Sequence, residues 1–245
     1  MSIQIRPYRS SDKRQVHRVF STSMKSLESA RFRALLKGPL VSISYAIWSL
    51  VVVCGAFQQL SWLRQNMPYH FILRFAHVLM SLAMVAVALV LPLIALRRFL
   101  RNQVDRFLDN AIKSDLGDIE AVYGVGKRGD GIFLVAEQEG GKIVGTVGAE
   151  PKGNGVFELR RLSVLTTIRK QGVAGRLIKK LEEHVKPKKM YLSCSNIQNA
   201  AIKLYEKNGF RFVRRFMRHT KLLNRQAFHF SEYEKVYDDE VDAMI

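Results

Sequence analysis

The sequence predicts a mixed α/β domain that is interrupted by a long apolar helical hairpin. Three observations support this fold class. Short β-rich runs alternate with segments of helical periodicity on both sides of the interruption. Two long runs without a charged residue lie between those parts. A glycine-containing loop joins one predicted strand to the helix that follows it.

The individual strands and helices follow from local patterns. Ile3 and Ile5 alternate with polar residues, which predicts a short first strand. The segment Ser10–Asp12 then offers N-caps for a helix. Two β-rich runs flank Glu-Gly-Gly at 139–141, which indicates an antiparallel hairpin. The remaining expectations are helices over 104–112, 172–185 and 199–209 and strands over 132–136, 142–149, 157–165, 190–195, 212–217 and 227–230.

The amino-acid composition restricts the kinds of binding partner and the cellular compartment that are expected. The 245 residues include 39 Lys and Arg against 21 Asp and Glu, a net charge of +18, which favours an anionic partner: a membrane surface, a phosphate-bearing ligand or nucleic acid. No nucleic-acid-binding motif is visible, so nucleic acid is the least favoured. Two cysteines make no disulfide framework and indicate a reducing compartment. Neither CxxC nor HExxH spacing occurs, so no metal site is predicted.

Two uncharged runs predict a membrane hairpin. As helices, residues 38–63 and 75–96 would span roughly 39 Å and 33 Å at about 1.5 Å per residue, enough for a hydrocarbon core of about 30 Å. Pro92 is a potential kink in the second run. The alternative is a buried helical hairpin in a soluble protein, which the length and nearly all-round apolar character of both runs disfavour.

The flanking charges predict how the hairpin is oriented. Four basic residues lie within 25–37 and four within 97–106, whereas the link over 64–74 holds two. The positive-inside rule therefore places both termini in the cytosol, with the link across the membrane or only dipped into it. The expected plan is one split domain over 1–37 and 97–232, the hairpin over 38–96, and an acidic C-terminal tail over 233–245.

The segment from Arg169 to Gly175 is the sharpest candidate site. Gly172 leaves no side chain between the backbone and a ligand. The helix expected to begin there presents unbonded N–H groups and the positive end of its dipole, which suit a pyrophosphate. Arg169 and Lys170 add positive charge. The alternative is an ordinary strand–loop–helix turn.

Further motifs surround this loop. LRRLSV, four residues and RKQGVAGRLI lead into the expected helix, and NAAIKLYEKNGF follows about 25 residues later. These stretches resemble the GNAT superfamily of acetyltransferases, whose Arg/Gln-x-x-Gly-x-Gly/Ala signature is matched by Arg169, Gly172 and Ala174. FRALLKGP before the apolar hairpin, then DLGDI, FLVAE and IVGTVGAEP, resemble the camello-like N-acetyltransferases, which include cysteine-S-conjugate and aspartate N-acetyltransferases. The resemblance implies an acyl-CoA N-acyltransferase fold with an inserted transmembrane hairpin.

The resemblance also implies acetyl-CoA as the cosubstrate, bound mainly by backbone groups. The strand before the loop would splay from its neighbour, so that Leu162, Ser163 and Val164 bind the pantetheine and polarise the thioester carbonyl. Many members place an Asn contact to CoA seven residues before a helical Tyr; here Gln198 stands in that place and Asn199 follows it. The loop residues implied at the pyrophosphate are Arg169, Lys170, Gln171, Gly172, Val173, Ala174 and Gly175.

Two side chains are candidates for catalysis. Tyr205 matches the family's Tyr that protonates or hydrogen-bonds the CoA sulfur; the alternative is a core aromatic. Glu158 begins the splayed strand, where several members place a carboxylate that acts through water; the alternative is a solvated strand end. Arg160 or Arg161 would face the acceptor and suit a substrate carboxylate. His219 is either a substrate contact or a surface residue.

The expected function is that of a membrane-anchored N-acetyltransferase. An amine would attack the thioester carbonyl, while donors stabilise the oxyanion and the leaving thiolate takes a proton. The resemblance favours a small amino-acid-like acceptor, such as a cysteine S-conjugate or aspartate, over protein lysines. It also implies the endoplasmic reticulum membrane, with the catalytic domain in the cytosol. The other alternative is an inactive, membrane-tethered CoA-binding scaffold, against which the intact motif residues argue.

Overall fold

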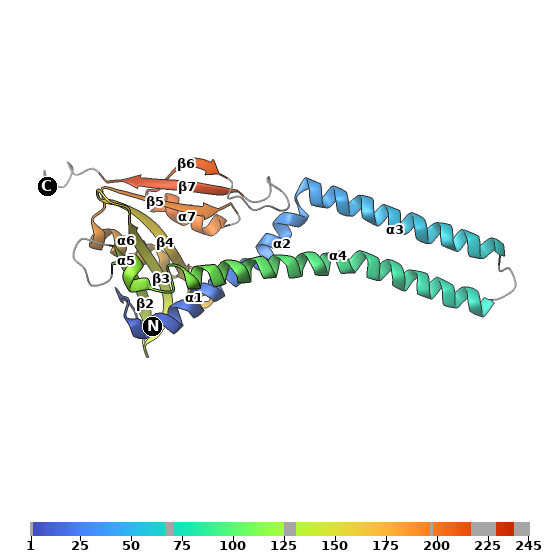
Figure 1. The fold of residues 1–245 in the computed structure, drawn as a ribbon, viewed down its shortest axis with the longest axis horizontal. Helices are drawn as coiled ribbons and strands as arrows, with labels where there is room; N and C mark the ends of the chain where they lie inside the picture. The colour runs from blue at the N-terminus through green and yellow to red at the C-terminus, as the bar shows by residue number, and fades with distance from the viewer. Residues whose placement is uncertain (1, 67–70, 125–130, 197, 217–228, 238–245) are drawn as a thin grey trace. The chain divides into compact units, whose positions relative to one another are not determined.

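A computed structural model describes residues 2–66, 71–124, 131–196, 198–216 and 229–237 (Figure 1). Its elements, in chain order, are β1 (Ile3–Pro7), η1 (Ser10–Asp12), α1 (Lys13–Lys25), α2 (Glu28–Leu36), α3 (Pro39–Asn66), α4 (Phe71–Lys113), α5 (Ile119–Tyr123), β2 (Ile132–Gln138), β3 (Lys142–Pro151), β4 (Val156–Val164), η2 (Thr166–Ile168), α6 (Val173–Val185), β5 (Lys189–Ser195), α7 (Asn199–Lys207), β6 (Arg211–Phe216) and β7 (Phe230–Val236).

The chain divides into two compact units. Residues 1–29 and 104–245 form the first unit, and residues 30–103 form the second. Helix α4 passes through Pro92 without a break, so its C-terminal turns belong to the first unit. The helix expected over 104–112 is present as the C-terminal part of α4. Proline lacks the N–H of one helical hydrogen bond, and α4 nevertheless continues on both sides of Pro92.

The second unit is dominated by α3 and α4. Two side chains of α3 bond to the backbone of α4: Tyr45 Oη donates to the carbonyl of Leu89 at 2.9 Å, and Trp48 Nε1 to that of Ala88 at 3.2 Å. Large apolar side chains on both helices are exposed, among them Phe57 at 70%. The unit therefore pairs two helices without burying their apolar surface.

A seven-stranded sheet organises the first unit. Its strand order is β1-β2-β3-β4-β5-β7-β6, with β4 and β5 parallel and every other neighbouring pair antiparallel. The hairpin expected around Glu-Gly-Gly is formed by β2 and β3, where Gln138 faces Lys142. Gly140 and Gly141 have φ values of +85° and +76°, which suit glycine in this tight connection. The predicted mixed α/β fold is thus confirmed.

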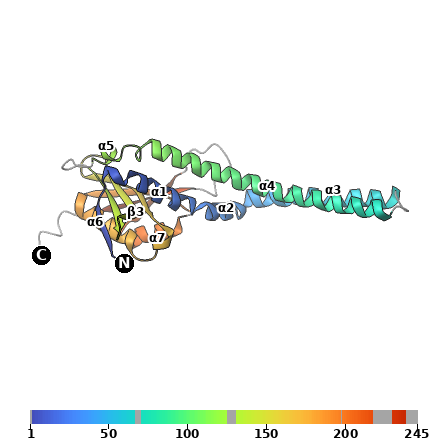
Figure 2. The same cartoon turned by 90° about the horizontal axis from the view of Figure 1, so that it is seen from below.

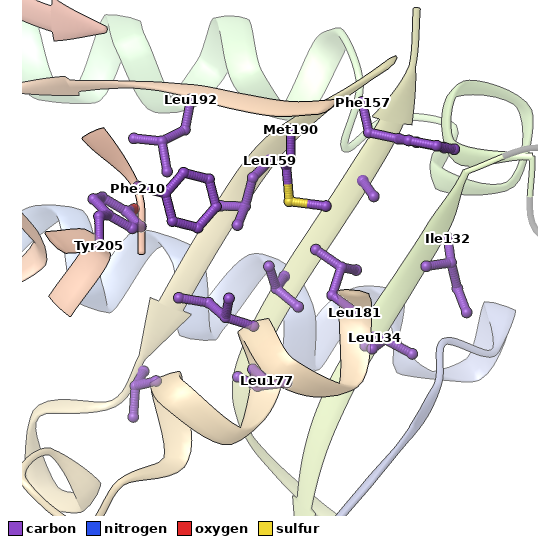
Figure 3. Close-up of a cluster of buried hydrophobic side chains, with 14 of the residues drawn as sticks. Ile132, Leu134, Phe157, Leu159, Leu177, Leu181, Met190, Leu192, Tyr205 and Phe210 are labelled. Carbon is purple, nitrogen blue, oxygen red and sulfur yellow. The ribbon is translucent and has the colours of Figure 1, made fainter. Parts of the chain in front are cut away.

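Helices cover both faces of this sheet, with α6 and α7 on one side and α1 and α5 on the other (Figure 2). The first core lies between the sheet and α6 and α7, and Figure 3 shows part of it. The second core joins α1, α5 and the end of α4 to β2 and β3. Fully buried side chains are found in both cores, among them Leu177, Ile178, Leu181, Met190, Val16, Leu116, Tyr123 and Phe133.

The last strand differs from the sequence expectation. Residues 227 and 228 of the strand expected over 227–230 lie outside the described residues. Strand β7 runs from Phe230 to Val236, so 233–236 belong to the sheet and not to an acidic tail. The acidic composition suggested solvent exposure. In the fold, however, Glu232 pairs with Arg214 at 2.9 Å and Glu234 pairs with Lys189 at 2.6 Å. Cross-strand cations therefore bring these carboxylates into a strand that is paired on both edges.

The first helix begins close to its expected start, but not through the expected cap. Asp12 precedes α1 and is buried, yet its side chain caps no amide of that helix. Its carboxylate accepts hydrogen bonds from the Arg6 guanidinium at 2.6 Å and from the Arg9 N–H at 2.9 Å. Asp12 thus ties the end of β1 to the turn before α1.

Candidate active site

Strands β4 and β5 pair only over their first residues. The parallel register begins at Val156 and Lys189 and ends at Glu158 and Tyr191, although both strands continue for several residues. Over the described remainder of the two strands no further partners join them. The open edge of β4 offers backbone N–H and C=O groups to an extended ligand. The divergence corresponds to the splay that the family resemblance implies.

Alternation along β4 decides which backbone groups face this opening. The N–H of Leu165 donates to the carbonyl of Val144 on β3 at 2.9 Å. Backbone groups of successive strand residues point to opposite edges, so those of Ser163 also face β3. Those of Leu162 and Val164 face the open edge. The Val164 carbonyl already accepts bonds from two side chains, at 3.0 Å and 3.2 Å.

The loop before α6 has the conformation that a glycine permits. Gly172 is the N-cap of α6, with φ of +74°, and a Cβ there would meet nothing within 4 Å. The space that a side chain at position 172 would occupy is therefore open, and α6 presents its first N–H groups next to that space. Lys170, Gln171 and Gly172 are exposed, Ala174 and Gly175 are half-buried, and Val173 is buried in the first core. Of the implied pyrophosphate residues, Lys170, Gln171 and Gly172 are thus open to a ligand, whereas the Val173 side chain is not.

Arg169 holds this loop in place. Its Nε donates to the carbonyl of Val164 at 3.2 Å, and its Nη2 donates to Oγ of Ser26 at 3.1 Å. The same Val164 carbonyl accepts a bond from Ser23 Oγ on α1 at 3.0 Å. The arginine that leads the signature motif therefore links the end of β4 to the end of α1, while its charge stays next to the loop.

Tyr205 lies inside the first core. Its ring packs edge-on against Phe210, with ring centroids 6.0 Å apart, and Leu192 lies nearby (Figure 3). Burial raises the pKa of Tyr205, and the neighbouring Cys194 adds to this effect. The phenol therefore stays protonated and can donate a proton or a hydrogen bond. Its packing also fits the alternative of a core aromatic.

The two polar residues at the start of α7 have different environments. Gln198 Oε1 accepts the N–H of Ser195 at 3.1 Å, and the Gln198 N–H donates back to the Ser195 carbonyl at 2.9 Å. The Gln198 side chain thus fastens the end of β5 to α7. Asn199 is exposed. Of the two, Asn199 is the one whose side chain is presented to solvent.

Glu158 lies on the sheet face opposite the first core. Its carboxylate pairs with Lys152 Nζ at 3.2 Å. A shallow open groove of ≈ 390 Å³ borders it, because Val156 and Tyr191 line the groove and Tyr191 is the β5 partner of Glu158. A carboxylate beside an open groove can take a proton through water. The other groove residues are Lys189, Arg214 and Glu232.

The two arginines on β4 do not point to opposite faces. Arg161 donates from Nε to Asp115 Oδ2 at 2.7 Å and from Nη2 to Asp115 Oδ1. Arg160 approaches the same carboxylate at 3.9 Å and pairs with Glu150. The Arg161 side chain is 10% exposed and that of Arg160 is 28% exposed. Of the pair, Arg160 is the one that an external carboxylate can reach.

Asp115 and Tyr123 are two buried polar residues that the sequence analysis did not single out. Tyr123 Oη donates to Asp115 Oδ2 at 2.7 Å, and both side chains are buried. Burial alone would raise the pKa of Asp115, but the hydrogen bonds from Arg161 and Tyr123 outweigh it and lower the pKa to about 2. The only sequence signal was the DLGDI stretch, which carries Asp115. His219 lies outside the described residues.

Comparisons with known proteins identify the class. Residues 129–212 match the family model of the acetyltransferase (GNAT) domain. Human N-acetyltransferase 8B is 30% identical over 92% of this chain and 92% of its own length. N-acetylaspartate synthetase of Xenopus tropicalis is 29% identical over 86% of this chain and 70% of its own length. A GNAT-family acetyltransferase of Staphylococcus aureus shares the fold, with a TM-score of 0.51 and 18% identity over 96% of this chain and 99% of that one.

The chain belongs to the GNAT acetyltransferases. It is an acetyl-CoA-dependent N-acetyltransferase, as the sequence motifs predicted. Its similarity to the N-acetyltransferase 8 proteins and to the N-acetylaspartate synthetases agrees with the narrower resemblance found in the sequence. The residues fit acetyl-CoA, because an open strand edge and a helix N-terminus with a bare glycine lie at the two ends of the same short loop.

Proposed function

We propose that this enzyme acetylates the amine of a small acceptor that carries a carboxylate, such as aspartate or a cysteine S-conjugate. The observation that carries the proposal is Arg160. It is partly exposed on β4 and follows Glu158 by two residues, so both side chains lie on the same face of the strand. A guanidinium there can bind a substrate carboxylate in a bidentate manner. The name of the related N-acetylaspartate synthetases supports the same acceptor class.

A substrate carboxylate has to compete with Glu150 for Arg160. Its carboxylate pairs with Arg160 and with Lys152, the latter at 2.6 Å. An incoming substrate carboxylate would share or displace the Glu150 contact, so binding is an exchange of one carboxylate for another. Arg161 is not available for the same role, because Asp115 takes its Nε and Nη2 donors.

The proposed reaction assigns one task to each part of the site. The N–H groups at the start of α6 bind the pyrophosphate, and the β4 edge at Leu162 and Val164 binds the pantetheine. The acceptor nitrogen attacks the thioester carbon, the C–S bond breaks, and the thiolate takes a proton from Tyr205. The proton released by the amine passes through water to Glu158. The product amide and CoA then leave, Glu158 releases its proton to water, and Tyr205 regains a proton from water.

The acceptor is tested by CoA release from the detergent-purified full chain. We expect release with aspartate or S-benzylcysteine and much less with S-benzylcysteamine, which lacks the carboxylate. Arg160→Gln should remove this preference, whereas Lys179→Gln, an exposed change on α6, should keep it. Equal release with and without the carboxylate would refute the acceptor proposal. Release only with a lysine peptide would replace it with protein acetylation, and acetyl-CoA binding without release from any amine would favour the scaffold.

We also propose that the enzyme is anchored in a membrane by α3 and α4, with both termini cytosolic and the endoplasmic reticulum as the membrane. Within the segments Val41–Trp62 and Phe75–Lys113, the most apolar 18-residue windows have mean hydropathies of 1.7 and 2.7. Their most apolar windows are 0% and 6% buried within the protein, which is the opposite of a soluble core hairpin. Lipid would cover this apolar surface. The basic flanks support the orientation.

A further inference from the structure

Strand β4 is irregular next to the place proposed for the pantetheine. Thr146 faces Ser163, but Gly148 faces Arg160, so Arg161 and Leu162 lie together opposite a single residue of β3. This is a β-bulge, in which one extra residue re-aims the strand that follows. Leu162, the first residue after Arg161, has its backbone groups at the open edge. The position of the bulge therefore sets which backbone groups face the opening.

The bulge requires an unfavourable backbone conformation. Arg161 has φ of +55°, which glycine adopts readily and a side chain disfavours. Such a conformation costs on the order of 1–3 kcal/mol and persists only where surrounding contacts determine it. One contact is local: Thr146 Oγ1 donates to the Arg161 carbonyl at 2.9 Å. The others involve the Arg161 side chain.

Asp115 supplies the strongest of those side-chain contacts. Its carboxylate accepts both the Nε and the Nη2 of Arg161, which fixes the guanidinium in plane. Phe20 of α1 closes one face of the guanidinium, with the ring centroid 4.8 Å from Cζ. Tyr123 Oη fixes the carboxylate in turn at 2.7 Å. The Asp115 side chain is 4% exposed, so solvent does not compete for these bonds.

We propose that Asp115 is a positioning residue for acetyl-CoA: by holding Arg161 in the bulge, it sets the register of the β4 backbone that receives the pantetheine. The inference rests on the pantetheine lying along β4, as proposed above. Asp115 does not touch the cosubstrate. It acts through Arg161, from the turn that follows α4, and it explains why a bidentate ion pair is buried beside the cosubstrate strand.

The test is the dissociation constant and stoichiometry of acetyl-CoA for the full chain in detergent, measured by titration calorimetry. Asp115→Asn is expected to raise the dissociation constant about ten- to hundredfold, as small misplacements of binding groups do. Asp105→Asn is the matched control, because Asp105 pairs with Lys25 at 3.4 Å in an exposed ion pair. Tyr123→Phe keeps the ring and removes one bond to Asp115, so a smaller rise is expected and provides a second route if Asp115→Asn fails to fold.

A glycine rescue distinguishes positioning from general stability. Glycine adopts a positive φ without strain, so Arg161→Gly should restore most of the affinity in the Asp115→Asn background, whereas Arg161→Ala should not. An unchanged dissociation constant in Asp115→Asn would overturn the proposal, even if the stoichiometry of binding is reduced. Equal affinity of the glycine and alanine double variants would also overturn it. Gly172→Val reports on the cosubstrate site independently. If it also leaves affinity unchanged, the placement of acetyl-CoA is wrong, and the positioning role falls with it.

Discussion

A Cβ atom added at Gly148 on β3 would lie 2.5 Å from Cε1 of Tyr123 on α5. Real carbon atoms do not approach so closely, so Tyr123 packs against the sheet only because position 148 has no side chain. The same added atom would lie 3.0 Å from the ring of Phe133. Gly148 thus makes room for the tyrosine that holds Asp115.

We expect Gly148→Ala to lower the free energy of unfolding by about 1–3 kcal/mol, because the added methyl group overpacks a rigid ring. Gly175→Ala is the control for stability, since a Cβ there meets nothing within 4 Å and alanine favours the helix. Thermal unfolding followed by near-ultraviolet circular dichroism measures both. A Gly148→Ala protein as stable as the parent would contradict the packing described for Tyr123.

Substitution of Gly172 should weaken acetyl-CoA binding. Gly172→Val places a branched side chain at a φ of +74° and over the first N–H groups of α6. We expect the KM for acetyl-CoA to rise about tenfold or more, with little change in the KM for the acceptor. Gly172→Asn tolerates the left-handed conformation and should have a smaller effect. Steady-state kinetics with each substrate varied in turn would separate these results from a general loss of activity.

Tyr205→Phe tests the proton donor. We expect kcat to fall about 10²–10⁴-fold with little change in KM or in the unfolding temperature, because the ring remains and only the hydroxyl is lost. Burial raises the pKa of Tyr205 above its ordinary value of 10.0, so the phenol keeps its proton at every pH below that value. Any alkaline fall in wild-type kcat below pH 10.0 must then arise from another group. An undiminished kcat in Tyr205→Phe would leave Tyr205 as a core aromatic only.

The ionisation of Asp115 should make the free energy of unfolding depend on pH in the acid range. Burial, which raises its pKa, is outweighed by the bonds from Arg161 and Tyr123, which lower it from 3.8 to about 2. A lowered folded-state pKa means that the stabilisation is present above 3.8 and is lost as pH falls through about 2. The stabilisation from the lowered pKa of Asp115 amounts to about 2 kcal/mol. In urea unfolding between about pH 2 and 7, Asp115→Asn should flatten the acid slope, whereas Asp105→Asn should retain it.

The hairpin predicts a defined membrane topology. An Asn-X-Thr acceptor inserted in the link between α3 and α4 should be glycosylated in microsomes, and the same acceptor at either terminus should not. The protein should also stay in the membrane during alkaline carbonate extraction. Release by carbonate would rule out the spanning hairpin. Glycosylation at a terminus, or retention without glycosylation of the link, would replace the proposed orientation or indicate a re-entrant hairpin.

Features that depend on short stretches of chain could be predicted from the sequence. The loop at Gly172 is one example, because glycine and a helix start are encoded within a few residues. The β2–β3 hairpin and α7 are others. The errors lie where distant parts decide the outcome. Asp12 does not cap α1, because Arg6 takes its carboxylate. Residues 233–236 join β7, because Arg214 and Lys189 compensate the carboxylates of this strand.

The sequence by itself determined the class of enzyme and the loop proposed for its cosubstrate, because backbone recognition of a pyrophosphate needs only local elements: a strand end, a bare glycine and a helix start. Only the tertiary structure decided where the side chains of Arg160 and Arg161 point. Simple alternation would send Arg160 and Arg161 to opposite faces, but the bulge rotates Arg161 so that both approach Asp115. That carboxylate arrives from a turn 46 residues earlier in the chain, and no local pattern can specify such a pairing.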